Sequence, residues 1–447
     1  MDILRDALRM LGQHPLCDHC LGRQFALLGH GVENDERGKA IKLVLTFKAH
    51  ALALSKNKQG MKTLKTLAMN GFWDLAREIL QKIERNIHVK DRPEACFLCE
   101  GKFDILDDLV GKALKLLEDY EYNSFLVGIE LPVTVAERED EFKGEFEVRY
   151  GENLRNEFGR VIGKKIAAIN GKAVDFKKPE IVVLANPFAE QINLQVNPLF
   201  IAGRYRKLLR GIPQSKWFCS NCWGKGCEKC NYTGKMYPES VQEIIERPFL
   251  DETEGAGASF HASGREDIDA RMLGNGRPFV IEVIRPKRRF LDLKKIEKTV
   301  NAFGEGKVEV SGLSFANRDV VRRLKKAEGA QKEYRVLMEF ENAIKAKDLD
   351  ALKKNLTNVT IKQETPTRVL HRRANLTREK YIYEVNLKKL SPKKAEMKIR
   401  CQGGLYVKEL VTGDEGRTVP SISEILKNKA KPVKLDVLNV IMEDQGK

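Results

Sequence analysis

Eight of the nine cysteines in this 447-residue sequence occur as four C-x-x-C pairs, and only Cys401 stands alone. The pairs are Cys17 and Cys20, Cys96 and Cys99, Cys219 and Cys222, and Cys227 and Cys230. A C-x-x-C turn lets two thiolates face one metal ion at about 2.3 Å, and two such turns complete a tetrahedral site. In a long chain this spacing indicates metal or redox chemistry rather than a disulfide scaffold.

The strongest metal signal is the segment from Cys219 to Cys230, which places four cysteines within twelve residues among glycines that permit tight turns. Zinc is favoured over an iron–sulfur cluster, and a redox pair or inert buried thiols are the alternatives. The two N-terminal pairs lie far apart in the sequence, so a shared site requires the fold to join two helical regions. Two separate sites are favoured, and cross-pairing with the later cysteines stays open. Neither set offers an obvious open coordination position, so both are expected to be structural.

A second candidate for chemistry is the polar, turn-rich segment 259–279, which runs directly into an apolar strand and contains Asp267 and Asp269. A carboxylate at such a junction can act as a base or a nucleophile, although an aspartate in a charged loop is usually only solvated. An Asp-x-Asp pair could also bind the metal of a nucleotide-sugar transferase. The sequence has neither G-x-x-x-x-G-K-[ST] nor a strand-linked G-x-G-x-x-G to hold phosphates, which argues against that function. His261 and His371 have no recognisable partner constellation and are given no role.

Three stretches of the C-terminal half, taken together, resemble one enzyme family. Gly264-Arg-Glu-Asp267 resembles the G-R-x-D motif of pseudouridine synthases, and the string GREDIDARMLGNGRPF is similar to the branch that modifies the T-loop of archaeal and eukaryotic tRNA. Lys332-Glu-Tyr334 resembles the K-x-Y motif of these enzymes. The segment from Cys401 to Leu410 resembles their late C-x-x-G-x-Y-[IV]-[RK] motif. The resemblance covers most of residues 236 to 447.

The resemblance implies a role for each matching residue. Asp267 would be the catalytic carboxylate, and Lys408 would pair with it. Tyr334 would contact the target base, Tyr406 would line the pocket, and Arg265 would contact the substrate. Lys408 stands where many relatives carry arginine. Lysine offers a carboxylate one charged group, whereas arginine can donate two parallel hydrogen bonds. From the residues alone, Tyr334 could equally be an ordinary strand tyrosine, and Tyr406 could be a packing residue.

The implied reaction is the isomerisation of uridine to pseudouridine in the T-loop of tRNA, at position 54, position 55 or both. It breaks the bond between ribose C1′ and uracil N1 and rejoins the ribose to C5, so it needs no organic cofactor and no catalytic metal. One ionised carboxylate can attack C1′ or remove the C2′ proton. A nearby lysine or arginine keeps that carboxylate charged, and an aromatic ring holds the flipped uracil. The partner is then tRNA, bound at its T-arm, with no obligatory protein partner.

The overall charge also indicates a polyanionic partner. Lysine and arginine number 79 against 63 acidic residues, which gives a formal net charge of +16, and the pI is near 9.3. Nucleic acid gains entropy from counterion release on a basic surface. Basic runs such as Arg204–Arg210 and Arg285–Arg289 could form that surface or be solvated faces. A non-catalytic zinc-containing protein that positions tRNA for a partner enzyme would use the same surface and is the alternative function.

The sequence shows no sign of membrane insertion. No apolar run approaches the ~18 residues of a membrane span. The N-terminus reads as an amphipathic helix without the features of a secretory signal. We therefore expect a cytoplasmic location.

The secondary structure that positions these residues is expected to change along the chain, from helices at the start to a mixture of strands and helices. Apolar spacing is helical from the start to about Val89 and again from Ile105 to Leu117. Strands are expected at 125–131, 180–185, 279–284, 334–340, 380–387 and 435–441. Helices are expected at 292–302 and 421–428, the latter opening with a Ser421-x-x-Glu424 capping box.

We expect an α+β fold with two regions. Residues 1–235 would form an accessory RNA-binding region with a helical module, cysteine-held metal and a zinc knuckle at about 217–234. The resemblance implies that residues 236–447 form a pseudouridine-synthase domain with a mixed, mainly antiparallel sheet. The resemblance alone places a THUMP-like RNA-binding domain at about residues 60–185.

Overall fold

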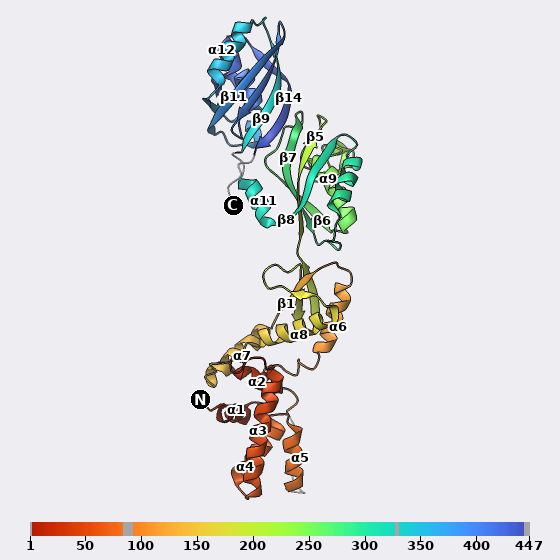
Figure 1. The fold of residues 1–447 in the computed structure, drawn as a ribbon, viewed down its shortest axis with the longest axis vertical. Coiled ribbons are helices and arrows are strands. Elements are labelled where there is room, and N and C mark those ends of the chain that lie inside the picture. The colour runs from red at the N-terminus through yellow and green to blue at the C-terminus, as the bar shows by residue number, and fades with distance from the viewer. Residues whose placement is uncertain (1, 84–92, 327–329, 442–447) are drawn as a thin grey trace. The chain divides into compact units, whose positions relative to one another are not determined.

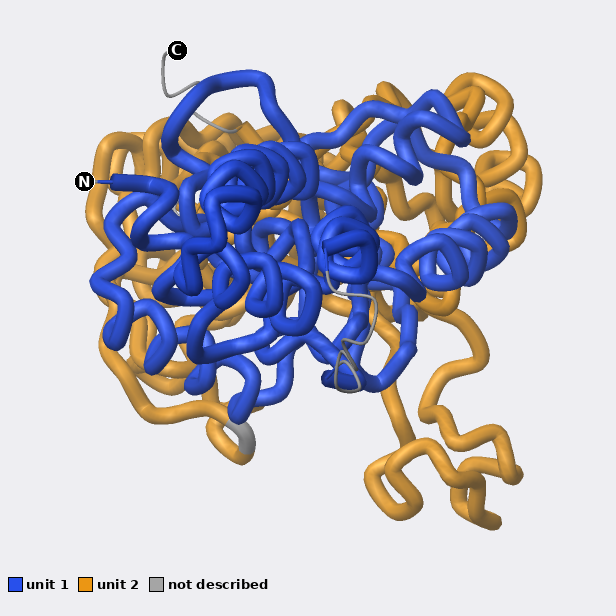
Figure 2. Tube along the Cα trace, turned by 90° about the horizontal axis from the view of Figure 1, so that it is seen from below, with its two compact units in different colours: residues 1–197 blue, residues 198–447 orange. Residues whose placement is uncertain are grey.

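The computed structural model describes residues 2–83, 93–326 and 330–441, and the chain divides into two compact units, unit 1 (1–197) and unit 2 (198–447) (Figures 1 and 2). The part of the expected helical stretch from residue 84 to Val89 lies outside the described residues. The division falls earlier than the expected boundary at residue 235. Strand β5 (Leu199–Lys207) pairs with β7 (Arg271–Ile284) and β8 (Val308–Ala316), and therefore belongs to the sheet of unit 2.

The first part of unit 1 is a group of helices. They are α1 (Ile3–Gln13), α2 (Asp18–Gly22), α3 (Asn34–Leu54), α4 (Lys58–Met69) and α5 (Asp74–Ile83). Helix α1 is capped by Asp2, whose carboxylate accepts from two backbone N–H groups of the first turn. Its apolar residues recur with helical spacing, and Ala7, Met10 and Leu11 are buried. The helical module expected at the N-terminus is confirmed.

The rest of unit 1 is a four-stranded sheet in the order β2-β1-β3-β4, with β1 parallel to β2 and β3, and β3 antiparallel to β4. The strands are β1 (Ser124–Ile129), β2 (Ala173–Val174), β3 (Ile181–Asn186) and β4 (Gln191–Val196). The helices are α6 (Leu106–Leu117), α7 (Val133–Glu145) and α8 (Leu154–Asn170). Helices α6 and α8 lie beside the sheet in Figure 1, and Phe125, Phe158 and Ile181 are buried in this core.

Unit 2 is built on a ten-stranded sheet in the order β13-β10-β11-β12-β9-β14-β7-β5-β8, with β6 paired to β7. The remaining strands are β6 (Gly257–Ala262), β9 (Gln331–Phe340), β10 (Val359–Glu364), β11 (Thr377–Ser391), β12 (Lys394–Cys401), β13 (Thr418–Val419) and β14 (Ala430–Ile441). Among the described strand pairs of this sheet, only β14 with β7 is parallel. The expected mixed, mainly antiparallel sheet is confirmed.

Two hydrophobic cores lie along this sheet. Helices α9 (Val241–Thr253) and α10 (Leu293–Phe303) belong to the core around β5 and β7, and α11 (Arg318–Lys326) contacts β6 and β7. Helices α12 (Ala346–Leu356), α13 (Val407–Thr412) and α14 (Ile422–Leu426) belong to the core around β9 to β12. The expected capping box of Ser421 and Glu424 begins α14. Tyr334 packs against both cores, so β9 marks the seam between them.

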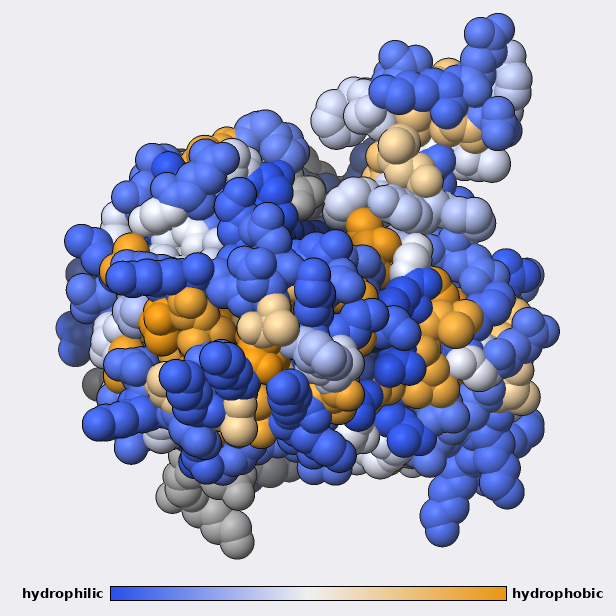
Figure 3. Space-filling view, turned by 90° about the horizontal axis from the view of Figure 1, so that it is seen from above, coloured by the Kyte–Doolittle hydropathy of each residue, from blue (hydrophilic) through white to orange (hydrophobic). Residues whose placement is uncertain are grey.

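The face of the molecule in Figure 3 is mainly hydrophilic, as the high content of charged residues predicts. On this face hydrophobic residues are scattered between hydrophilic ones, and 32% of the residues in the chain are charged. None of the described helices combines the length and the apolar character needed to span a lipid bilayer.

Candidate active site

Unit 2 has a cavity of about 500 Å³ at the seam between β7, β9 and β14. Eight of its lining side chains are basic, namely Arg265, Arg277, Lys332, Arg368, Arg373, Arg378, Lys380 and Lys408. Only Glu266 and Asp267 contribute carboxylates. A concave site with this excess of positive charge attracts a polyanion.

Asp267 lies in the loop between β6 and β7, which we call the aspartate loop (Gly264–Asp269). Its Oδ2 is 3.2 Å from Lys408 Nζ and 3.3 Å from Arg368 Nη2. Two cations at this distance stabilise the negative charge of a carboxylate. The loop begins at Gly264 with a φ of +77°, and a Cβ there would lie 3.0 Å from Lys332 Nζ. The positive φ therefore favours glycine three residues before the aspartate.

Asp269 has a different environment. Both of its carboxylate oxygens accept from Lys408 Nζ at 2.7 Å, and its side chain is 68% exposed. Partial burial would raise the pKa of Asp269, but the hydrogen bond and charge of Lys408 outweigh it, so the pKa is lowered. Lys408 thus links the two aspartates, and only Asp267 lines the cavity.

The backbone of the aspartate loop is held by a fully buried lysine. Lys207 Nζ donates to the backbone carbonyls of Ile212 at 2.8 Å, Asp267 at 3.1 Å and Ile268 at 3.2 Å. Burial lowers the pKa of Lys207, and the Glu266 carboxylate 4.0 Å away opposes this shift. All three N–H groups of the ammonium are directed at carbonyl oxygens, so Lys207 fixes the backbone that carries Asp267. Sequence reasoning missed this residue, although Tyr205 and Lys207 occupy alternate positions of β5, as inward-facing residues do.

A buried hydrogen-bond network surrounds Lys207. Glu266 accepts from Tyr205 Oη and from Arg277 Nε, both at 2.9 Å. Gln214 Nε2 donates to Tyr205 Oη at 2.7 Å and to the carbonyl of Gly264 at 2.9 Å. Burial raises the pKa of Tyr205 well above its ordinary value, so the phenol keeps its proton and can donate. Buried polar networks whose members are satisfied are rigid, and this one fixes the start of the aspartate loop.

Tyr334 lies on β9, between β12 and β14, and lines the cavity. Burial raises the pKa of Tyr334 well above its ordinary value, and Cys401 and Asp267 add to the shift. The ring is therefore neutral at physiological pH. Cys401 pairs with Lys332 across the ladder, and burial raises the pKa of its thiol to about 12.

Arg368 is a site residue that the sequence analysis missed. It lies in the 3-10 turn Thr367–Arg372, and its Nε donates to Glu409 Oε1 at 2.7 Å. Glu409 is buried, so it holds the guanidinium in the orientation in which Nη2 meets Asp267. No spacing in the sequence connects Arg368 with Asp267, because the contact joins segments about a hundred residues apart.

The structure brings the five residues of unit 2 that the resemblance singled out to one cavity. Arg265, Asp267, Tyr334, Tyr406 and Lys408 all line it. Tyr406 donates its backbone N–H to Gln363 Oε1 at 2.8 Å, and its hydroxyl accepts from Arg373 at 3.1 Å. His261 and His371, which were given no role, are not lining residues.

The paired cysteines form two tetrads in the described residues, Cys17, Cys20, Cys96 and Cys99 in unit 1 and Cys219, Cys222, Cys227 and Cys230 in unit 2. Within each tetrad the four sulfur atoms lie within 4.8 Å of one another. The Sγ atoms of Cys17 and Cys99 are 3.6 Å apart, and those of Cys222 and Cys230 are 3.8 Å apart. A tetrahedron of sulfur atoms about 2.3 Å from a central ion has edges of about 3.8 Å. The thiols therefore fit a tetrahedral metal, and the two separate sets favoured by the spacing are confirmed.

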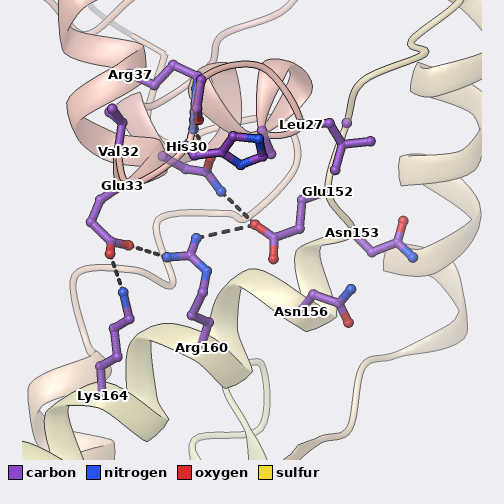
Figure 4. A pocket seen from close by; sticks show the side chains of 15 residues that line it. Leu27, His30, Val32, Glu33, Arg37, Glu152, Asn153, Asn156, Arg160 and Lys164 are labelled. Carbon is purple, nitrogen blue, oxygen red and sulfur yellow. Dashed lines mark hydrogen bonds and ion pairs between the residues drawn. The ribbon is translucent and has the colours of Figure 1, made fainter.

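Unit 1 has a further polar cavity, in which the charged side chains pair with each other (Figure 4). Arg160 pairs with Glu33 and lies 3.3 Å from Glu152, and Lys164 also pairs with Glu33. Asn34 donates to Glu152 at 2.7 Å. Two carboxylates face three cations here, whereas the cavity of unit 2 has eight basic side chains and two carboxylates.

A carboxylate between two cations, in a basic cavity with a tyrosine ring, is an arrangement that fits a polyanion with aromatic bases. The fold and the site thus indicate the class of RNA-modifying enzymes. Residues 200–441 match the family described as Pus10, C-terminal, and residues 109–186 match the archaeal Pus10 THUMP domain. The chain belongs to the Pus10 family, which confirms the resemblance. The THUMP match begins later than the expected residue 60, and residues 58–83 form two helices of the N-terminal group.

Relatives match over nearly the whole chain. The tRNA pseudouridine synthase Pus10 of Methanocaldococcus jannaschii is 46% identical over 440 residues, which cover 96% of this chain and 93% of that protein. The protein of the same name from Pyrococcus furiosus is 37% identical over 444 residues and 99% of each chain. Among solved structures, a Cbf5–Nop10–Gar1 complex gives a TM-score of 0.30 with 13% identity over 54% of this chain and 50% of that one, which is too low to carry an argument.

Proposed function

We propose that this chain is a tRNA pseudouridine synthase that isomerises uridine to pseudouridine in the T-loop, at position 54, position 55 or both. The observation that carries the proposal is Asp267, which faces a cavity lined by eight basic side chains and pairs with Lys408 and Arg368. Relatives from other organisms that are named tRNA pseudouridine synthase Pus10 support this reaction. The T-loop as target rests on the resemblance of the motif around Asp267.

Asp267 would begin the reaction by one of two routes. Its carboxylate attacks ribose C1′ while the C1′–N1 bond breaks, or it removes the C2′ proton so that the same bond breaks by elimination. The detached uracil then turns, and C5 bonds to C1′. On the first route this displaces Asp267 from C1′, and on the second the proton returns to C2′. In both cases C5 then loses its proton and N1 gains one, which restores the aromatic ring and balances the isomerisation.

The neighbours of Asp267 have complementary tasks in this proposal. Lys408 and Arg368 hold the carboxylate by charge, and Arg368 is itself held by Glu409. Tyr334 presents a neutral ring on which the flipped uracil stacks. The remaining basic side chains, among them Arg265 and Lys380, bind the phosphates that flank the target nucleotide.

We further propose that both cysteine tetrads hold zinc and that the zinc is structural. Four thiolates complete a tetrahedral coordination shell and leave no position for substrate. In unit 1, the ion would join α2 to the segment around Cys96. Thiolates that bind zinc must stay reduced, which is typical of a reducing compartment, so we place the protein in the cytoplasm.

The test is to incubate the zinc-loaded full chain alone with an unmodified tRNA transcript and to map pseudouridine. The Asp267→Asn variant should give no product, because the amide matches the carboxylate in size but is far weaker as a base or nucleophile. Its zinc content and tRNA affinity should stay near wild type. The matched control Asp269→Asn should slow turnover without abolishing it, since its side chain does not line the cavity.

Transcripts with cytidine at position 54 or 55 assign the target nucleotide. Substantial product from Asp267→Asn would refute the catalytic assignment. Equal loss in both aspartate variants, with sensitivity to a chelator of divalent ions, would indicate a metal-binding Asp-x-Asp pair instead. Tight tRNA binding without product from the wild-type chain would favour the non-catalytic tRNA-binding protein.

A further inference from the structure

The cysteine knuckle of unit 2 (Trp217–Gly234) exposes large aromatic side chains. Trp223 is 80% exposed, Tyr232 is 73% exposed and Phe218 is 54% exposed. Exposed aromatic rings that cluster within eighteen residues mark a surface that contacts a partner. None of the roles assigned to unit 2 above uses these rings.

The metal-binding turns themselves fix the two most exposed rings. The backbone N–H of Trp223 donates to the carbonyl of Cys219 at 2.9 Å, and that of Tyr232 donates to the carbonyl of Cys227 at 2.9 Å. Trp223 therefore directly follows the first C-x-x-C turn, and Tyr232 follows the second turn by two residues. Both residues have a positive φ, +52° for Trp223 and +59° for Tyr232, which is uncommon for bulky side chains. The knuckle thus presents a pair of exposed rings on a backbone that its own hydrogen bonds hold in place.

The charge of the knuckle argues for bases rather than phosphates as the partner groups. Together with its two flanking residues Lys216 and Lys235, the knuckle has four lysines, which are opposed by Glu228, and four thiolates around a divalent ion add two negative charges. The segment therefore carries a net charge of only about +1. Lys235 is already paired with Glu243 at 2.7 Å, and Lys216 Nζ lies 5.4 Å from the centre of the Phe218 ring. Attraction of phosphates is weak here, whereas every unpaired base offers a face to an aromatic ring.

The knuckle is joined to the aspartate loop through the segment that precedes it. Gln214 donates to the carbonyl of Gly264, and the N–H of Gly211 donates to the carbonyl of Ile268 at 2.9 Å. The five residues from Gln214 to Cys219 span at most about 17 Å when fully extended. A nucleic acid that occupies the cavity is therefore within reach of the knuckle.

We propose that the knuckle binds unpaired bases of the substrate tRNA, with Trp223 and Tyr232 stacking on them. This inference rests on the proposed function, since it takes tRNA as the occupant of the cavity. The knuckle would then add sequence-tolerant affinity next to the basic cavity, because stacking accepts any base.

The test measures the affinity of the zinc-loaded full chain for unmodified tRNA as a function of salt, together with pseudouridine formation. Trp223→Ala and Tyr232→Ala should each weaken binding about 5- to 150-fold, the range for losing one stacked base. The slope of log affinity against log salt should not change, because no phosphate contact is lost. Trp223→Phe should retain most of the affinity, whereas Trp223→Leu should lose it. Phe303→Ala, which removes a ring that is 53% exposed at the end of α10, is the control.

A second measurement locates the contact directly. tRNA that carries 4-thiouridine should crosslink under ultraviolet light to the peptide that contains Trp223 or Tyr232. Unchanged affinity in both alanine variants, with zinc content and product formation intact, would overturn the inference and leave the proposed function standing. Loss of affinity in these variants, in a chain that forms no pseudouridine, would support the inference while the proposed function fails. A decrease of the salt slope instead of the affinity would show phosphate contacts and would also overturn stacking.

Discussion

Replacing Lys207 by methionine tests whether the geometry of the aspartate loop controls catalysis. The side chain is fully buried, and its ammonium donates to three backbone carbonyls, two of them in the aspartate loop. Each buried carbonyl that loses its donor costs about 1–3 kcal/mol. Part of this cost is recovered, because the desolvation of an ammonium group itself costs several kcal/mol. We expect a net loss of about 3–5 kcal/mol in the free energy of unfolding of unit 2, as for other disrupted buried charge networks.

A domain whose stability lies above the lower end of the ordinary range of about 5–15 kcal/mol stays folded at 25 °C after such a loss. The folded variant should nevertheless be about 100-fold slower in single turnover, because a displacement of a reacting group by about 1 Å has an effect of this size. Its tRNA affinity should not change, since Lys207 has no exposed surface. Single-turnover rates and tRNA Kd values are to be measured at a temperature where circular dichroism shows the variant to be folded.

The matched control is Arg206→Met. Arg206 is the preceding residue of β5, its side chain is 49% exposed, and it pairs with Glu309 on the surface. Surface pairs contribute about 0–1 kcal/mol, so this variant should keep both its stability and its rate. A Lys207→Met variant that loses stability but reacts at the wild-type rate would show that Lys207 serves stability alone. The proposed link between this buried ammonium and the position of Asp267 would then be wrong.

Three further changes test other parts of the site. Lys408→Ala should lower the single-turnover rate more than Arg368→Ala, because Lys408 pairs with both aspartates; equal rates in the two variants would contradict the central place of Lys408. Tyr334→Phe should retain more activity than Tyr334→Ala, since stacking on a base contributes about 1–3 kcal/mol; if the alanine variant melts earlier but its folded fraction reacts normally, the ring belongs to the core. Replacing Cys219 and Cys222 by serine should release one of two zinc ions, as elemental analysis of protein purified without added metal can show; wild-type protein without metal would refute both zinc sites.

Period-two patterns made some strands of unit 2 predictable. The expected strands at 334–340 and 435–441 fall within β9 and β14. In β9, Val336, Met338 and Phe340 stand at every second position and are buried in one core. The helix expected at 292–302 is α10, displaced by one residue, and its start is set by the Asp292 side chain that accepts from two backbone N–H groups. Local sequence predicts a strand or a helix where the residues of that element themselves carry the apolar pattern or the capping residue.

The basic run Arg204–Arg210 shows where this reasoning reaches its limit. The sequence suggested an RNA-binding face or a solvated one, yet Lys207 is buried, and Arg204 donates to the carbonyls of Asn275 and Gly276. Arg210 pairs with the buried Asp436, whose pKa is lowered to about 2: burial would raise it, but the hydrogen bonds and charges of the surrounding arginines outweigh that effect. Net charge counts residues, but it carries no information about which cations the fold buries.

The G-R-x-D resemblance singles out Asp267 rather than Asp269, but only the structure gives a physical reason for that choice. Both residues are carboxylates in one polar loop, and no property of either side chain favours one of them. The carbonyl contacts of Lys207 fix the backbone at residues 267 and 268, so that the Asp267 carboxylate lines the cavity. Lys408 Nζ donates to both carboxylate oxygens of Asp269, which does not line the cavity. The same Nζ lies 3.2 Å from Oδ2 of Asp267. Asp269 therefore holds the lysine that pairs with Asp267, which is why its loss should slow the reaction without stopping it.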